Sequence, residues 1–198
     1  MMRQNCIAIS FALVGALALV VGMGAITHAA VIYSDANDGF LEIRDNLPPQ
    51  SPWPTVHPDT FGNFDANVGE WFGPGLTTIV LPFELPNLGA VANPFTSADL
   101  GVMVHRLGDN TVTDVDLYGL SRVDANPAIS PADWYSGAAF DAGATLIQES
   151  FFTPGSPQGF VGTPNHNTDA TGDANLLSCL NAWYAGGANA GNFVFVRL

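Results

Sequence analysis

The chain has 198 residues, with 18 acidic side chains against five basic ones, all arginine, and a formal charge of −13. This balance argues against a nucleic-acid-binding protein and against polybasic attachment to anionic lipid, because both need a basic face. A disulfide scaffold is excluded as well. Cys6 lies in a predicted leader, which leaves Cys179 without a partner in its own chain.

Residues 1–29 have the pattern of an export signal. A short positive start containing Arg3 is followed by an uncharged apolar stretch from Ile7 to Ile26. Small residues then precede a cleavage point predicted after Ala29. The alternative is an uncleaved anchor, since twenty residues of helix would reach about 30 Å. The pattern predicts a secreted or cell-surface protein, with no membrane contact after cleavage and one domain over residues 30–198.

The rest of the chain is predicted to be mostly strands, because proline and glycine interrupt it too often for long helices. Short alternating segments predict strands at 31–33 (the first strand), 77–85, 98–107, 112–120, 145–152 and 192–198. Pro82 lacks a backbone N–H, so we expect an edge strand or a bulge there. The turn residues 108–110 predict a hairpin that joins the third and fourth segments.

Two helical segments are expected. Asp173 is the predicted N-cap of a helix that ends at Gly186. Its apolar face would consist of Leu176, Leu177, Leu180, Trp183 and Tyr184. A shorter turn is predicted at Ser130, with Pro131 in its first position and Asp133 three residues after the cap. Several short strands and one helix predict an all-β sandwich or barrel with one packed α-helix near the C-terminus.

The part of the chain from residue 77 to the end resembles a group of exported bacterial jelly-roll proteins. These are the DNRLRE-type or family-96 carbohydrate-binding-module-like proteins, which often carry a PEP-CTERM sorting tail. The motifs that carry the resemblance, in order, are VLPFELP (80–86), SADL (97–100), VDLYGL (115–120), DANLL (173–177) and NFVFVRL (192–198). The resemblance implies a jelly-roll-like β-sandwich that has a structural, adhesive or carbohydrate-contact role.

The sequence departs from this family at two places. Its tryptophan-rich segment is matched here only loosely, by Trp134. The chain also stops at Leu198 on an apolar strand, without the Pro-Glu-Pro tail. We therefore expect either a copy that lost its sorting tail or a truncated form that lacks its last strand.

Glycan contact would use exposed aromatic rings. The weak candidates are Trp53, Trp71, Trp134 and Tyr135, which lie in or beside predicted loops. Loop tryptophans more often cover the end of a sandwich core, so an exposed pair would be needed to support a ligand. An extracellular polysaccharide is the partner that this interpretation implies.

Catalytic and metal-binding patterns are weak. Cys179 lies among leucines, where a buried thiol is expected. His57, His105 and His166 are predicted to be surface loop residues, because no zinc-ligand spacing surrounds them. Asp114 and Asp116 would share a strand face about 7 Å apart, most simply as its solvent side.

Calcium is the more plausible ion for an acidic exported sandwich. The loop 35–39 resembles a calcium loop but departs from the EF-hand register, since Gly39 stands where an acid is needed. We therefore expect no cofactor, with calcium left open, and assign no metal ligand. The first hypothesis is a non-catalytic exported module. The alternative is an extracellular lyase or glycosidase with carboxylates converging on a jelly-roll face.

Overall fold

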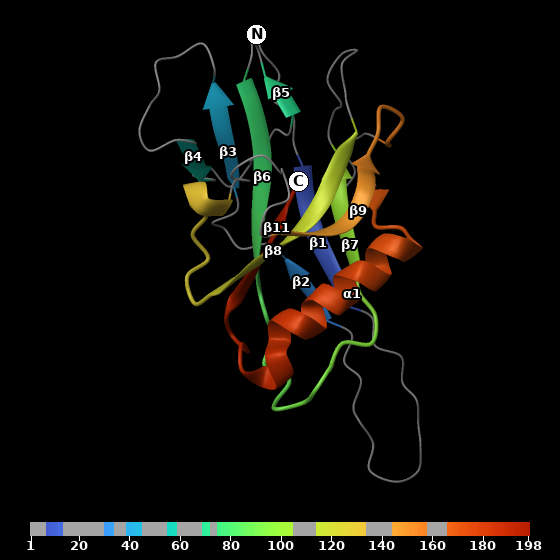
Figure 1. Cartoon of the computed structure of the whole chain (residues 1–198). Helices are drawn as coiled ribbons and strands as arrows, with labels where there is room; N and C mark the ends of the chain where they lie inside the picture. The colour runs from blue at the N-terminus through green and yellow to red at the C-terminus, as the bar shows by residue number, and fades with distance from the viewer. Residues whose placement is uncertain are drawn as a thin grey trace.

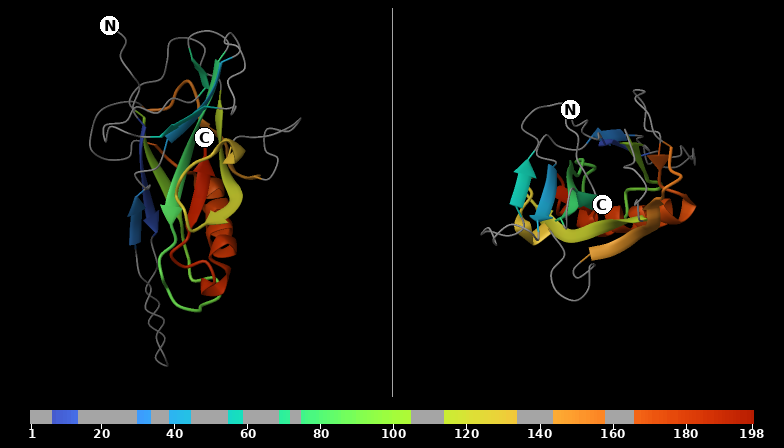
Figure 2. Two further views of the ribbon diagram at one scale, coloured as in Figure 1. Left: turned by 90° about the vertical axis from the view of Figure 1, so that its left-hand side faces the viewer. Right: turned by 90° about the horizontal axis from the view of Figure 1, so that it is seen from above.

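In the computed structural model, the described residues are 7–13, 30–33, 39–44, 55–58, 69–71, 75–104, 114–133, 144–157 and 166–198. They form two antiparallel sheets and one α-helix (Figure 1). Seen from above, the two sheets lie in separate layers (Figure 2). The expectation of a mostly β, sandwich-like fold with one packed helix is thereby confirmed.

The smaller sheet has four strands. Their order is β10 (His166–Asn167), β7 (Asp99–Val104), β1 (Ile7–Leu13) and β2 (Ala30–Tyr33). The strand expected at 31–33 is therefore present, but it is not the first. An earlier strand, β1, lies inside the predicted leader, where large apolar residues alternate from Ile7 to Leu13. Cleavage after Ala29 would remove β1 from between β7 and β2, and export stays a prediction.

The larger sheet has seven strands. Their order is β4 (Thr55–Pro58), β3 (Gly39–Arg44), β6 (Gly75–Glu84), β11 (Phe193–Arg197), β8 (Val115–Asp124) and β9 (Ala144–Phe152), with β5 (Gly69–Trp71) also paired to β6. The last strand of the chain, β11, thus lies in the middle of the sheet. Strands that are distant in the sequence are therefore neighbours in this sheet.

The predicted hairpin between the third and fourth segments is wrong. The third segment forms β7 of the smaller sheet, and the fourth forms β8 of the larger one. β7 pairs with β1 and β10, whereas β8 pairs with β11 and β9. The connection therefore passes from one sheet to the other. A local turn pattern cannot distinguish such a crossing from a hairpin.

β6 as a whole lies inside the larger sheet, but the edge position expected at Pro82 is present locally. Its pairing with β3 ends at Val80, so Pro82 has only β11 as a described partner. Ile79 and Leu198 exchange both backbone hydrogen bonds, which places the pair Pro82–Phe195 at a non-hydrogen-bonded position. The missing N–H of proline thus costs the sheet no bond to β11.

The helix α1 (Ala170–Tyr184) begins earlier than the sequence predicts. Its N-cap is Asp169, whose carboxylate accepts the N–H groups of Thr171 and Gly172, and Asp173 lies in the first turn. A Cβ at Gly172 would lie 2.3 Å from Gln148 Oε1, so glycine is needed for close approach here. The helix ends at a left-handed Ala185, followed by the 3₁₀ turn η2 (Ala185–Gly187).

The main core lies between α1, β7 and one face of the larger sheet, which we call the inner face. Alternate residues of β6 and β8 point into it, and Leu100 and Val102 of β7 are fully buried. From α1 it contains Leu176, Cys179, Leu180, Trp183 and Tyr184, while Leu177 is only partly buried. A smaller cluster of Val80, Leu120, Ile129 and Phe195 lies on the opposite, outer face.

Candidate functional site

Of the predicted glycan-contact aromatics, the structure describes Trp71 alone, so their grouping stays a prediction. Trp71 is the last residue of strand β5 and pairs with Gly75, so it does not lie in a loop. Trp53, Trp134 and Tyr135 lie outside the described residues. Trp183 is in the core, as expected, and its Nε1–H donates to the carbonyl of Leu120 at 3.0 Å.

The expectation of loop histidines is wrong for two of the three. His57 lies in strand β4, and His166 lies in β10, where it is partly buried. The ring of His166 packs against Phe151 and Phe152, with centroids 4.8 and 4.9 Å apart, and its Nε2 contacts the Phe151 carbonyl. Burial lowers the pKa of this imidazole. His105 lies outside the described residues.

Asp114 and Asp116 do converge, and they converge on Ser150. The Ser150 hydroxyl donates to Asp114 Oδ2 at 2.7 Å, and its N–H donates to Asp116 Oδ1 at 2.8 Å. The Tyr118 hydroxyl donates to Asp116 Oδ2 at 3.3 Å. The expected solvent face is therefore a cluster of paired polar side chains, which we call the Ser150 cluster.

An irregularity of the edge strand β9 creates this cluster. Val115 pairs with Phe152 but Leu117 pairs with Gln148, so β9 carries extra residues around Ser150. Ser150 has a φ of 51°, in the left-handed region that serine seldom adopts. The two aspartates satisfy the hydrogen-bonding groups that this bulge releases. Sequence reasoning missed Ser150 because a run of strand-forming residues gives no sign of a bulge.

The Ser150 cluster offers hydrogen-bonding groups beside apolar surface. Tyr118 pairs with Leu146, which is 41% exposed. Carboxylates and hydroxyls next to apolar contact area suit a polyhydroxyl ligand.

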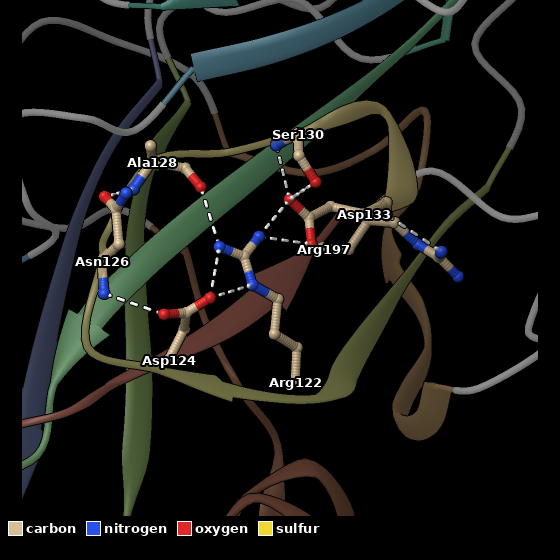
Figure 3. Close-up of polar contacts among 7 residues, drawn as sticks. All are labelled: Arg122, Asp124, Asn126, Ala128, Ser130, Asp133 and Arg197. Atoms are coloured by element: carbon tan, nitrogen blue, oxygen red, sulfur yellow. Dashed lines mark hydrogen bonds and ion pairs between the residues drawn. The ribbon is translucent and has the colours of Figure 1, made fainter.

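A second polar cluster surrounds Arg122 and holds the loop after β8 against the outer face (Figure 3). Nη1 of Arg122 donates to both carboxylate oxygens of Asp133, at 2.9 and 2.7 Å. Nε and Nη2 donate to Asp124 Oδ2, and Nη2 also donates to the Ala128 carbonyl at 3.0 Å. The guanidinium lies 4.1 Å from the ring centroid of Phe195, in cation–π geometry.

Asp133 is buried at 3% exposure and ends the short 3₁₀ helix η1 (Pro131–Asp133). The Ser130 N–H and hydroxyl both donate to Asp133 Oδ2, so the predicted turn is confirmed. Arg197, also buried, contacts the Asp133 carbonyl with its guanidinium. The Asp133 carboxylate thus accepts hydrogen bonds from Arg122 and Ser130, while its backbone carbonyl accepts one from Arg197. These bonds can hold the loop, and the carboxylate is already paired with the Arg122 guanidinium.

Asp124 forms the exposed side of the same cluster. The N–H of Asn126 donates to Asp124 Oδ1, and the N–H of Ala128 donates to the Asn126 side chain. Donation from the Asn126 backbone, helped by Arg122, lowers the pKa of Asp124. Alternating oxygens of this kind could suit calcium, but the guanidinium already occupies their centre.

A third cluster joins β7 to the start of α1. The Leu100 N–H donates to Thr168 Oγ1 at 3.0 Å, and the Thr168 hydroxyl donates to Asp173 Oδ1. Asp99 lies beside them, and its Oδ1 is buried without a hydrogen-bond partner, like the hydroxyl of Ser97. Burial, reinforced by the charge of Asp173, raises the pKa of Asp99. Sequence reasoning did not identify this cluster.

Metal ligation finds little support in the described residues. They contain no group of three or more histidine, cysteine, aspartate or glutamate side chains that could hold an ion. The loop 35–39, which resembles a calcium loop, lies outside them except for Gly39. Cys179 is a buried free thiol, as expected, and burial raises its pKa. Among the helices that the structure describes, none has the length and apolarity to cross a membrane.

Comparisons with known proteins found no match. No family model matches the chain, and neither the curated proteins nor the solved structures include a significantly similar one.

Proposed function

We propose that this chain is a non-catalytic, exported β-sandwich module with a structural, adhesive or carbohydrate-contact role outside the cell. The observation that carries the proposal is the closed state of the Arg122 cluster. Its guanidinium is paired with two carboxylates and a carbonyl, and Asp133 also accepts two bonds from Ser130. Charged groups engaged in this way stabilise a loop, and within the Arg122 cluster they are already paired with one another.

We also propose that the strands are connected as in a jelly roll and that the chain is related to carbohydrate-binding modules. The position of β11 between β6 and β8 supports it, because jelly rolls place neighbours that are distant in sequence side by side. On the outer face, the Ser150 cluster and exposed Leu146 supply the polar and apolar contacts that a sugar chain uses.

Purified protein should be tested against a panel of polysaccharides, with calcium and with a chelator. We expect retention on at least one polysaccharide and no release of shortened products. Absence of binding to every polysaccharide would remove the carbohydrate role and leave a structural one. Mass spectrometry of exported protein should give a chain that starts at Ala30, and an intact Met1 would contradict export with cleavage.

The alternative is a polysaccharide-degrading enzyme, and one observation favours it. Asp116 and Tyr118 form a hydrogen-bonded pair next to Ser150 and Asp114, and carboxylate–tyrosine pairs can transfer protons. Cleavage of any polysaccharide that Asp116→Asn abolishes would establish this alternative. Asp114→Asn serves as the matched variant, since it removes a neighbouring carboxylate from the same serine.

A further inference from the structure

The smaller sheet contains a strand that export would remove. β1 lies between β7 and β2 and pairs antiparallel with both, at six positions of β7 and four of β2. All of β1 precedes Ala29, the residue after which cleavage is predicted. The exported chain would therefore keep β7 and β2 and lose the strand that joins them.

Hydrogen bonds on the other side of β7 show which of its backbone groups face β1. The Leu100 N–H donates to Thr168 Oγ1, and the Leu100 carbonyl accepts the Thr168 N–H, both at 3.0 Å and on the side of β10. Successive residues of a strand direct their backbone groups to opposite sides. The N–H and carbonyl groups of Asp99, Gly101 and Met103 therefore face β1. Their partners in the register are, in the same order, Ala12, Ser10 and Ala8.

Removal of β1 would leave this row of backbone groups without partners. Gly101 is buried in the sheet, and Leu100 and Val102 on either side of it are fully buried. Buried N–H and carbonyl groups are nearly always hydrogen-bonded in folded proteins. A strand edge with such free groups can bind an extended chain as an added strand.

We propose that, once the leader is removed, β7 binds an extended segment of a partner protein in the place of β1. This proposal rests on the proposed function, since export with cleavage is what removes β1. The sequence of β1, IAISFAL, indicates the chemistry of the segment, because large apolar residues alternate there with alanine or serine and no charge occurs. The partner segment is therefore uncharged, apolar at alternate positions and antiparallel to β7.

The neighbouring strand β2 is a poor substitute for β1. Both β2 and β7 are antiparallel to β1, so they run parallel to each other and could not reproduce the antiparallel pairing. β2 also has four residues, whereas β1 pairs with six positions of β7. A strand from another chain can satisfy both requirements.

The test starts from secreted protein whose N-terminus is read by mass spectrometry. An intact Met1 would overturn the proposed export and this proposal with it, whereas a start at Ala30 leaves export in place and tests the proposal alone. The probe is a synthetic IAISFAL peptide with an uncharged solubilising tail. The matched control is the same peptide with Ser10→Pro, which lacks the N–H that faces Gly101.

Hydrogen exchange and thermal unfolding give the readouts. We expect the IAISFAL peptide to raise Tm and to slow exchange of the amides that face β1 by about tenfold or more, while the Ser10→Pro peptide does neither. These amides belong to Asp99, Gly101 and Met103. The Leu100 amide is the internal control, because its bond to Thr168 should protect it with or without peptide.

Three results would overturn the proposal. The first is protection of the same amides without peptide, since β2 or a second copy of the chain would then occupy the place, and sedimentation separates these two cases. The second is an equal effect, or no effect, of the two peptides. If the chain that starts at Ala30 does not fold alone, IAISFAL added during refolding should restore the folded state. Failure to restore it is the third result.

Discussion

The two faces of the larger sheet are covered in different ways. The inner face is covered by α1, which contributes large apolar side chains to one continuous core. The outer face is covered in part by the loop after β8, which Arg122 holds through carboxylates on both sides. An apolar cover depends on packed area, whereas a polar cover depends on a few bonds with defined partners. The two covers should therefore fail differently when single residues are changed.

The largest effect is expected on the apolar side. Leu180 is 3% exposed in the core, so Leu180→Ala should lower the free energy of unfolding by about 2–5 kcal/mol, as other buried leucine truncations do. Denaturant unfolding measures this loss. Ser178→Ala, at an exposed position of the same helix, is the control and should change stability little. An unchanged Tm for Leu180→Ala would show that the helix does not pack there.

The second effect is expected on the polar side. Arg122→Ala would leave the Asp133 carboxylate buried without its counterion, at a cost of about 2–4 kcal/mol after allowance for the partly exposed arginine. Chemical denaturation measures the cost. The double variant Arg122→Ala/Asp133→Asn should recover part of it, because asparagine keeps an acceptor for Ser130 but carries no charge. Equal stability of the single and double variants would show that the stranded charge is not the cause.

The difference between the two covers also decides what the sequence could predict. Periodicity predicted Leu180, Trp183 and Tyr184 on the core side of a helix, because apolar spacing within one element is local information. The Ser130–Asp133 turn was predicted for the same reason. The partnership of Arg122 with Asp133 was not predicted, because it depends on how the chain turns back across Phe195.

The candidate sites were less predictable than the fold. Asp114 and Asp116 were selected from strand alternation, but their partner Ser150 depends on a bulge that alternation does not encode. The N-cap was predicted at Asp173 but lies at Asp169. Between the two residues, Gly172 allows the helix to approach Gln148 closely, which is a tertiary feature. The β7–β8 hairpin failed because a turn pattern contains no information about which sheet the next strand joins.

A third prediction tests how closely the helix approaches the sheet. A Cβ at Gly119 would lie 2.7 Å from Cζ2 of Trp183, so Gly119→Ala should cost about 1–3 kcal/mol through overpacking. The Trp183 ring cannot move away freely, because its Nε1–H is bonded to the Leu120 carbonyl. Unfolding followed by tryptophan fluorescence measures the change. Gly155→Ala is the control, since a Cβ there would have no neighbour closer than 4.0 Å. Full stability of Gly119→Ala would mean that α1 sits farther from β8.

The smallest effect is expected at the exposed side of the Arg122 cluster. The side chain of Asp124 is 44% exposed, whereas that of Asp133 is 2% exposed, and exposed ion pairs contribute little in water. Asp124→Ala should therefore lower Tm by only a small fraction of the fall caused by Arg122→Ala.

The effect of Asp124 should also depend on pH. The pKa of Asp124 is lowered mainly by the Asn126 N–H, so the contribution of Asp124 to stability is present at neutral pH and is lost as the pH falls below the ordinary aspartate value of 3.8. Thermal unfolding at neutral and acidic pH should show the two curves converging in acid. Asp124→Asn, which keeps the acceptor for Asn126, should lie closer to wild type than Asp124→Ala. A fall as large as that of Arg122→Ala would instead make Asp124 the main partner of the guanidinium and would remove the contrast between its buried and exposed sides.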